Sequence, residues 1–439
     1  MRTTLLPLLL LATLLRAEPL AERVDALAAP YAQSGAIVGM VVGVRDAPGE
    51  EIIRGYGDSK PTADTLYEIG SVSKVFTGVL LAALVRDGGA SLDTPVEALL
   101  PEGSRVPASG ERKITLVDLS THTSGLPRMP DNFAPKDPTN PFADYTEERL
   151  LSFLAAAKPA RAPGVAYEYS NVGVGLLGWA VARKAGKSYE EYLTEQITAP
   201  LGMKSTVVTL TPDTKARLAP GHDMEGKPQA NWDLTSLAGA GGIRSTVADM
   251  MLFLKANLAG GMRPIDVALA AAREVRYTPP EPGAQRMGLG WHISAPGVHW
   301  HNGQTGGYHS FAAVDTAGGR AVVVLADTAT GDVDELGNDL VRMLAGVKVE
   351  KLTIKPEILA EYAGTYAIVP QFKLVVTVER GRLMVQATGQ PKFSVYPKSE
   401  TEFFYKVVDA QLTFERDAAG KVIRLILHQN GRDMPGNRE

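Results

Sequence analysis

Strand-like segments stand at both ends of the first 347 residues of this 439-residue chain, and mostly helical sequence separates them. Residues 36–44 form an apolar run that is typical of a buried strand, and a second strand is expected over 52–56. The segment from Ser91 to about Asn257 is helical and rich in loops. Further strands are expected over 298–301, 308–314 and 321–325, followed by an amphipathic helix over 333–344. The pattern predicts an α/β (α+β) domain in which both ends complete one sheet around an inserted helical subdomain.

The chain after Lys348 has a different character. Short segments of alternating apolar residues are separated by turns at Arg380-Gly381 and 417–420. This pattern predicts a small antiparallel β domain of barrel-like form. The expected organisation is therefore a leader over 1–17, a main domain over 18–347 and a C-terminal β domain over 348–439.

The N-terminus has the features of a secretory signal. Arg2 precedes an apolar run over 5–15, and Ala17 offers a small residue for cleavage before Glu18. The run is too short to span a bilayer, although a run of this length is also compatible with a buried helix. We expect export to the periplasm, and the complete lack of cysteine suits it, since no disulfide or thiolate metal site is needed. The net charge of −4 and the absence of basic clusters argue against nucleic acid as a partner.

A candidate nucleophile lies in the segment Leu66–Thr77. Lys74 follows Ser71 by one helical turn, so on a helix that begins at Ser71 the two side chains share a face. Helix formers continue to Arg86, and Gly88 is placed to end the helix. A serine hydroxyl attacks only when a base takes its proton, and the apolar neighbours of Lys74 disfavour its ammonium form. By itself Ser-x-x-Lys is expected about once or twice by chance in such a chain, so the assignment of a nucleophile depends on further motifs.

Two later motifs supply those companions. Tyr169-Ser170-Asn171 stands at a loop-to-helix junction and offers a phenol that can carry a proton and an amide that can bind a substrate backbone. His301-Asn302-Gly303-Gln304 lies at the end of a strand and offers a cation and open backbone N–H groups. Each has a plain alternative, which is favoured when the residue is taken alone: Tyr169 is then a packed aromatic and His301 a satisfied strand histidine.

In this order the motifs resemble those of the serine β-lactamase and penicillin-binding protein superfamily. The Tyr-x-Asn form and the run from Ile69 to Lys74 are similar to its class C branch, as are three further segments, 121–126, 200–203 and 242–249. Within that branch the chain most resembles D-alanyl-D-alanine carboxypeptidase/endopeptidases of the AmpH type with an appended lipocalin-like domain. One departure is that His301 stands where β-lactamases carry lysine, a replacement that resembles certain DD-peptidases.

The resemblance implies a role for each motif residue. Ser71 would attack the carbonyl, while Lys74 and Tyr169 would share its proton. The backbone N–H groups of Ser71 and Gln304, next to Gly303, would form the oxyanion hole. Asn171 would orient the acyl side chain and His301 the substrate carboxylate, with Arg286 as a second carboxylate contact.

Three functions remain open at this point. The first is a penicillin-binding DD-peptidase acting on peptidoglycan stem peptides, the second a β-lactamase or promiscuous esterase, and the third a non-catalytic penicillin sensor. No cofactor is expected. The letters of a dinucleotide fingerprint over 173–178 lack the surrounding βαβ unit and read as glycines for helix packing. The pair His299 and His301 has no third ligand at useful spacing, so we expect no metal. Lys184-Ala185-Gly186 reads as a helix end.

Overall fold

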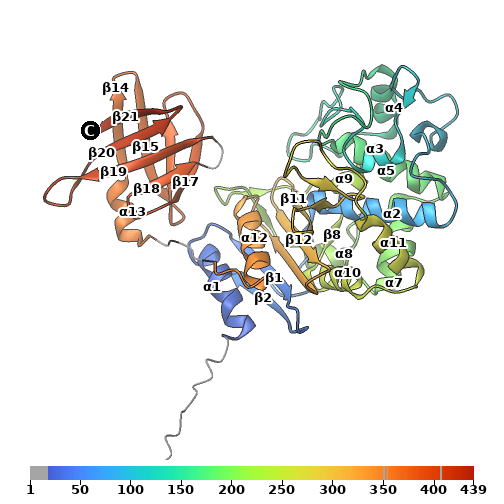
Figure 1. Ribbon diagram of the computed structural model, residues 1–439, viewed down its shortest axis with the longest axis horizontal. Helices are drawn as coiled ribbons and strands as arrows, with labels where there is room; N and C mark the ends of the chain where they lie inside the picture. The colour runs from blue at the N-terminus through green and yellow to red at the C-terminus, as the bar shows by residue number, and fades with distance from the viewer. Residues whose placement is uncertain (1–17, 350–351, 353, 406–407) are drawn as a thin grey trace, which may run out of the picture.

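The computed structural model describes residues 18–349, 352, 354–405 and 408–439 (Figure 1). The signal sequence expected over residues 1–17 lies outside the described residues. Within the described ranges, no helix is both long and apolar enough to cross a bilayer.

A seven-stranded antiparallel sheet forms the centre of the main domain. Its order is β2-β1-β13-β12-β11-β10-β9, so the N-terminal hairpin pairs directly with the last strand of the domain. Met40 lies opposite Ala326 and Arg45 opposite Ala321. The strands are β1 (Gly39–Arg45), β2 (Glu51–Gly57), β9 (Arg286–Met287), β10 (His292–Ile293), β11 (His299–Gln304), β12 (His309–Asp315) and β13 (Arg320–Ala326). The predicted fold, a sheet completed by both ends of the domain, is confirmed.

Helices cover both faces of the sheet because its central strands are apolar on both sides. Met40, Val42 and Val44 of β1 pack with α1 (Leu20–Gln33) and α12 (Asp332–Leu344). Val41 belongs to the larger core on the other face, which α2 (Ser73–Arg86) and α10 (Val247–Ala259) supply. Figure 1 shows these layers, with the helical subdomain above α2. A strand buried on both faces loses the apolar/polar alternation, which explains the continuous apolar runs in the sequence.

The helical subdomain lies between β2 and β9 in the chain. Its helices are α3 (Leu116–Ser120), α4 (Glu147–Ala156), α5 (Asn171–Lys184), α6 (Tyr189–Leu193) and α9 (Ala238–Gly241). The neighbouring helices are α7 (Ala199–Leu201), α8 (Pro212–Ala216) and α11 (Pro264–Arg273). The glycines of α5 allow close packing on α9, since a β-carbon on Gly178 would lie 2.9 Å from the Gly239 Cα. Gly186, after α5, has a φ of 71°, as expected for the residue that ends a helix.

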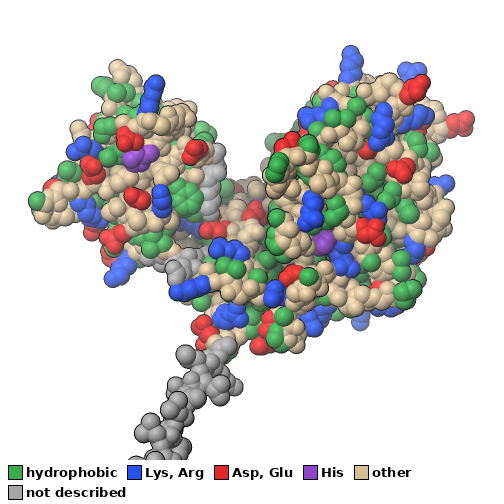
Figure 2. Space-filling model, in the orientation of Figure 1, with side chains coloured by type: hydrophobic (Ala, Val, Ile, Leu, Met, Phe, Trp, Pro, Cys, Tyr) green, Lys and Arg blue, Asp and Glu red, His purple; other side chains and the backbone are tan. Residues whose placement is uncertain are grey.

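The C-terminal domain is a closed antiparallel barrel of strands β14 to β21, preceded by α13 (Pro356–Tyr362). The strands are β14 (Gly364–Val369), β15 (Phe372–Glu379), β16 (Arg382–Ala387), β17 (Lys392–Pro397), β18 (Glu402–Tyr405), β19 (Ala410–Arg416), β20 (Val422–Gln429) and β21 (Arg432–Arg438). The barrel forms a separate lobe in Figure 2, with a hollow between it and the main domain. Arg382 of β16 pairs with the buried Asp332 at the start of α12, so an ion pair joins the lobes.

Candidate active site

Ser71 lies where the chain enters the central helix. A short 3₁₀ turn (Gly70–Val72) precedes α2, so the helix begins two residues later than predicted. Lys74 Nζ lies 2.8 Å from Ser71 Oγ and donates a hydrogen bond to the Ala240 carbonyl at 2.6 Å. The nearby Ser73 is fully buried, and its hydroxyl accepts the Ile243 N–H at 3.1 Å. Only Ser71 therefore combines a nearby amine with access to the cleft.

Lys74 is fully buried within the site. Burial lowers the pKa of its amine well below the usual value, and the positive charge of Arg128 lowers it further. The neutral amine is consequently favoured, and it can accept the Ser71 proton.

Tyr169 adjoins both groups. Lys74 Nζ lies 4.9 Å from the centre of its ring, and its hydroxyl is in hydrogen-bonding contact with Ser71. Burial raises the pKa of Tyr169 to about 12, although the Ser71 hydroxyl and Arg128 counteract part of that effect. Tyr167, by contrast, faces the rings of His122 and His292, at centroid distances of 5.7 and 6.3 Å.

The Tyr169 motif is fixed by hydrogen bonds to the segment that begins at His122. The Ser170 N–H donates to His122 Nδ1 at 3.0 Å, and the His122 ring stacks on Tyr169 at 4.4 Å. The Ser170 hydroxyl caps α5 by accepting the Gly173 N–H. Asn171 begins α5 and lines the cleft beside Ser71.

Gly303 and Gln304 lie against the start of the helix. A β-carbon on Gly70 would come within 2.6 Å of the Gln304 nitrogen, so the two backbones are in close contact. The Thr305 N–H donates to the Tyr308 carbonyl at 3.0 Å, and strand alternation therefore directs the Gln304 N–H away from β12. The Ser71 N–H lies in the first helical turn, where backbone donors lack intrahelical acceptors. The N–H groups of Ser71 and Gln304 thus both lie where β11 contacts the start of the helix. The sequence predicted a strand over 298–301, whereas β11 continues through Gln304.

His301 is completely buried, and its ring lies 6.3 Å from that of Tyr169. Burial lowers its pKa well below the usual value, and His292 and Lys74 add to the effect. Its Nδ1 donates to the Asn302 carbonyl, which leaves Nε2 as a buried acceptor with no partner in the described part of the chain. The sequence argument expected a cation here, but burial favours the neutral imidazole.

Arg286 does not join this group of residues. It lies on the edge strand β9, and its guanidinium donates to the Ser294 carbonyl at 2.9 Å in the turn before β11. No contact recorded for the described residues brings it to Ser71. The expectation of a second carboxylate contact fails because the sheet register places Arg286 opposite Ile293, with His299 of β11 in the next strand.

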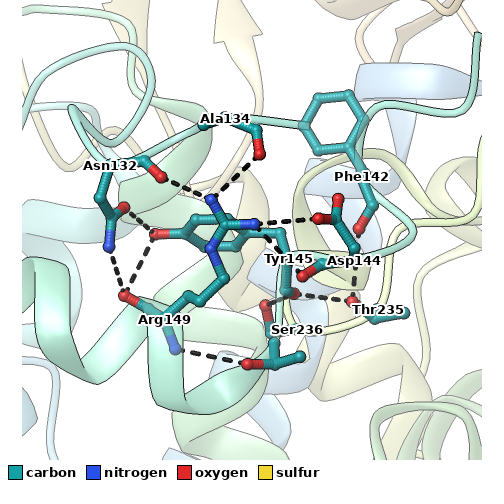
Figure 3. A network of polar contacts seen from close by, with 9 residues as sticks. Asn132, Ala134, Phe142, Asp144, Tyr145, Arg149, Thr235 and Ser236 are labelled. Carbon is teal, nitrogen blue, oxygen red and sulfur yellow. Dashed lines mark hydrogen bonds and ion pairs between the residues drawn. The ribbon is translucent and has the colours of Figure 1, made fainter. Parts of the chain in front are cut away.

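Phe142 and Trp232 form an apolar wall of the cleft that the sequence did not reveal. Their rings are 5.3 Å apart, and both line the space beside Ser71. The proline-rich loop that carries Phe142 is fixed in place (Figure 3): Arg149 donates to the Asn132 carbonyl at 2.7 Å, and the Tyr145 carbonyl accepts the Ser236 hydroxyl at 2.6 Å. The folded chain thus shows which side chain this loop presents to the cleft.

Trp232 is held by a buried ion pair. The Trp232 N–H donates to Glu68 at 2.9 Å, while Arg244 donates to the Trp232 carbonyl at 2.6 Å. Glu68 and Arg244 are 3.4 Å apart and almost completely buried. Arg244 belongs to the segment 242–249 noted in the sequence. Its hydrogen bond to Trp232 connects that segment to the wall of the cleft.

Arg128 is an exposed, charged residue beside Tyr169 that was not predicted from the sequence. It follows the segment 121–126 by two positions, and its guanidinium carbon lies 5.0 Å from the centre of the Tyr169 ring. This closeness in sequence to the segment 121–126 was the feature from which Arg128 could have been predicted to lie near the site. His299 and His301 were the histidine pair for which a metal site was considered and not expected. His299 Nε2 forms a hydrogen bond to the Arg273 carbonyl at 2.9 Å. Within the described ranges, no three His, Cys, Asp or Glu side chains come together in a metal-binding arrangement.

A serine and a buried amine at hydrogen-bonding distance, with a phenol and two neighbouring backbone donors, on this α/β sheet, define a serine hydrolase. The chain belongs to the beta-lactamase family, whose model, described as "Beta-lactamase", matches residues 24–346. A second model, described as "Domain of unknown function (DUF3471)", matches residues 349–438.

Individual relatives agree with this assignment. The chain is 34% identical over 340 residues to D-alanyl-D-alanine-carboxypeptidase/endopeptidase AmpH of Escherichia coli K12, covering 72% of this chain and 86% of that protein. It is 32% identical over 281 residues to a beta-lactamase of Pseudomonas fluorescens, covering 62% of this chain and 73% of that protein. A solved beta-lactamase/D-alanine carboxypeptidase of Yersinia pestis superposes with a TM-score of 0.65 at 27% identity, covering 74% of this chain and all 100% of that one.

Proposed function

We propose that this protein is an exported, penicillin-binding D-alanyl-D-alanine carboxypeptidase/endopeptidase that acts in the periplasm on peptidoglycan stem peptides through an acyl-enzyme on Ser71. The observation that carries the proposal is the contact of 2.8 Å between Ser71 Oγ and the buried amine of Lys74. Similarity to AmpH, whose name states this activity, supports the choice of substrate. The leader expected over residues 1–17 supports export.

In the proposed acylation, Lys74 accepts the Ser71 proton as Oγ attacks the carbonyl carbon. The backbone N–H groups of Ser71 and Gln304 stabilise the oxyanion. The C–N bond then breaks, and Tyr169 delivers a proton to the leaving nitrogen. Asn171 holds the acyl side chain. In deacylation, water attacks the ester carbon and gives a proton to the deprotonated Tyr169 as base, while Lys74 returns to Ser71 Oγ the proton that it accepted, which frees the acid and restores the site.

His301 has a different part in this scheme from the one expected for a lysine. As a neutral imidazole it offers one buried acceptor nitrogen rather than a positive charge. We infer that His301 takes part in substrate binding through hydrogen bonding. A class C-like β-lactamase or an esterase uses the same first step, so the second step separates these functions.

Mass spectrometry of the purified protein gives the decisive experiment. The protein is mixed with benzylpenicillin or with a peptide ending in D-Ala-D-Ala, and the acylated mass at Ser71 is followed over time. A DD-peptidase forms a long-lived penicilloyl adduct and releases D-alanine from the peptide. Rapid loss of the penicilloyl mass without D-alanine release would indicate a β-lactamase instead, and the absence of any adduct would contradict the acyl-enzyme.

A further inference from the structure

Arg128 is held at the catalytic phenol by its own backbone. Its carbonyl accepts the N–H of Asn171 at 2.9 Å and that of Val172 at 3.4 Å, so the residue is joined to the start of α5. The guanidinium carbon lies 5.0 Å from the Tyr169 ring centre, within the range of a cation–π contact. The side chain is nevertheless exposed, so an incoming molecule can reach it.

The positive charge of Arg128 acts on both Lys74 and Tyr169. The pKa values of Lys74 and Tyr169 are both lowered by Arg128, and no carboxylate is among the groups that shift them. Glu168 adjoins Tyr169 in sequence, but it is paired with Arg161 at 2.8 Å. The position beside Tyr169 therefore carries a positive charge that forms no ion pair with a carboxylate of the described residues.

Arg128 makes no ion pair with any described residue of the chain. Its neighbours in the same subdomain do: Arg112 contacts Asp118 at 2.9 Å, and Arg149 contacts Asp144 at 3.1 Å. A guanidinium has five donors arranged to match a carboxylate. Among the described residues, the Arg128 guanidinium has the cation–π contact with Tyr169 and no side-chain hydrogen bond or ion pair, so these donors are available to a ligand.

We propose that Arg128 binds a carboxylate carried on the acyl side of the substrate, and so selects acidic over amidated stem peptides. This inference rests on the proposed function and specifies its substrate. His301 cannot supply the charge, because burial favours its neutral imidazole, and Arg286 lies at the edge of the sheet. Arg128 is an exposed cation that contacts the catalytic phenol.

The side of the substrate follows from Asn171. The Arg128 carbonyl holds the Asn171 N–H, and Asn171 is the residue proposed to bind the acyl side chain. Gln304 and His301 lie on β11, a different element. A carboxylate on the acyl side thus meets Arg128, whereas one on the leaving group does not.

Two penicillins form a matched pair for the test, because carbenicillin is benzylpenicillin with one carboxylate added to its acyl side chain. In both, the Ser71 Oγ–carbon bond forms, the lactam C–N bond breaks and the lactam nitrogen takes the proton. The ratio of their second-order acylation rates isolates the added carboxylate. We expect Arg128→Gln to lower the carbenicillin-to-benzylpenicillin ratio by about tenfold, the usual size for one hydrogen bond to a charged group.

Two further variants complete the comparison. Arg128→Lys should keep part of the preference, because the charge remains while the fork of donors is lost. Arg161→Gln removes the same charge from an exposed arginine that is already paired with Glu168, and it should leave the ratio unchanged. An Arg128→Gln protein that acylates with the wild-type ratio would overturn the proposal.

A binding measurement separates this inference from the proposed function. In a Ser71→Ala background, calorimetry compares D-Ala-D-Ala peptides whose acyl-side carboxylate is free or amidated. Arg128→Gln should weaken binding of the free acid by about tenfold and leave the amide unaffected. Equal effects on both peptides would overturn the role of Arg128. Failure of the wild-type protein to be acylated by either penicillin would contradict the proposed function alone.

Discussion

Gly303 packs directly against Ser71, so closely that a β-carbon on Gly303 would lie 2.7 Å from the Ser71 nitrogen. The same carbon would lie 2.1 Å from the Ile69 carbonyl oxygen, which is backbone and cannot rotate away. The glycine therefore brings β11 to the start of the helix and sets the distance between the two backbone donors of the proposed oxyanion hole.

We expect Gly303→Ala to lower the acylation rate by about a hundredfold, because the forced separation moves one oxyanion donor out of place. The rate is measured with benzylpenicillin, and a thermal melt records whether the fold persists. Gly331→Ala is the matched control, since nothing lies within 4 Å of its added carbon. Wild-type acylation by a folded Gly303→Ala protein would refute the assignment of Gly303.

Ser71→Ala should abolish labelling by a fluorescent penicillin. Ser73→Ala should still be labelled, because the Ser73 hydroxyl is buried and accepts the Ile243 N–H. Loss of that hydrogen bond should cost about 1 kcal/mol of stability, measured by urea unfolding. A label that persists in Ser71→Ala, or maps to Ser73 by peptide mass, would show that another residue is acylated.

Tyr169→Phe should lower turnover by about 10² to 10⁴, the usual range for loss of a general acid or base. Tyr167→Phe should fall far less, because Tyr167 contacts His122 and His292 rather than Ser71. Turnover of a D-Ala-D-Ala peptide provides the measurement. Equal losses in the two variants would mean that both rings serve packing.

The buried amine of Lys74 should make the protein's stability depend on pH. Its pKa is lowered in the folded state, so the unfolded state binds more protons between that pKa and about 10.5. Stability should therefore rise with pH across this window. Lys74→Met has no amine that titrates in this window. The amount by which its free energy of unfolding exceeds that of the wild type should therefore shrink between pH 7 and pH 10 in paired urea titrations. A constant difference between the two proteins would indicate that Lys74 is not desolvated.

The C-terminal barrel should be dispensable for acylation, because every proposed catalytic residue precedes it. A chain ending at residue 347 should form the penicilloyl adduct at close to the full-length rate. Arg382→Ala in the full chain provides the control, since it removes the ion pair with Asp332 that joins the lobes and keeps the barrel present. A truncated protein that melts cooperatively but is not acylated would show that the barrel contributes to the site.

The local parts of this protein follow from its sequence. Apolar runs predicted the buried strands, and the one-turn spacing of Ser71 and Lys74 placed both side chains on one face of the helix. Gly88 and Gly186 located the ends of α2 and α5. These features depend on residues close together in the chain, so periodicity and spacing were sufficient to predict them.

The charge states of the site residues, and the groups that contact them, depend on tertiary packing. By the resemblance of its motif, His301 stands where β-lactamases carry lysine. Burial beside His292 nevertheless favours its uncharged form. Arg128 meets Tyr169 across 41 positions of sequence, and Trp232 meets Phe142 across 90. Desolvation and charge compensation are set by groups from distant segments, and so only the folded chain shows that the exposed Arg128 lies against the ring of Tyr169.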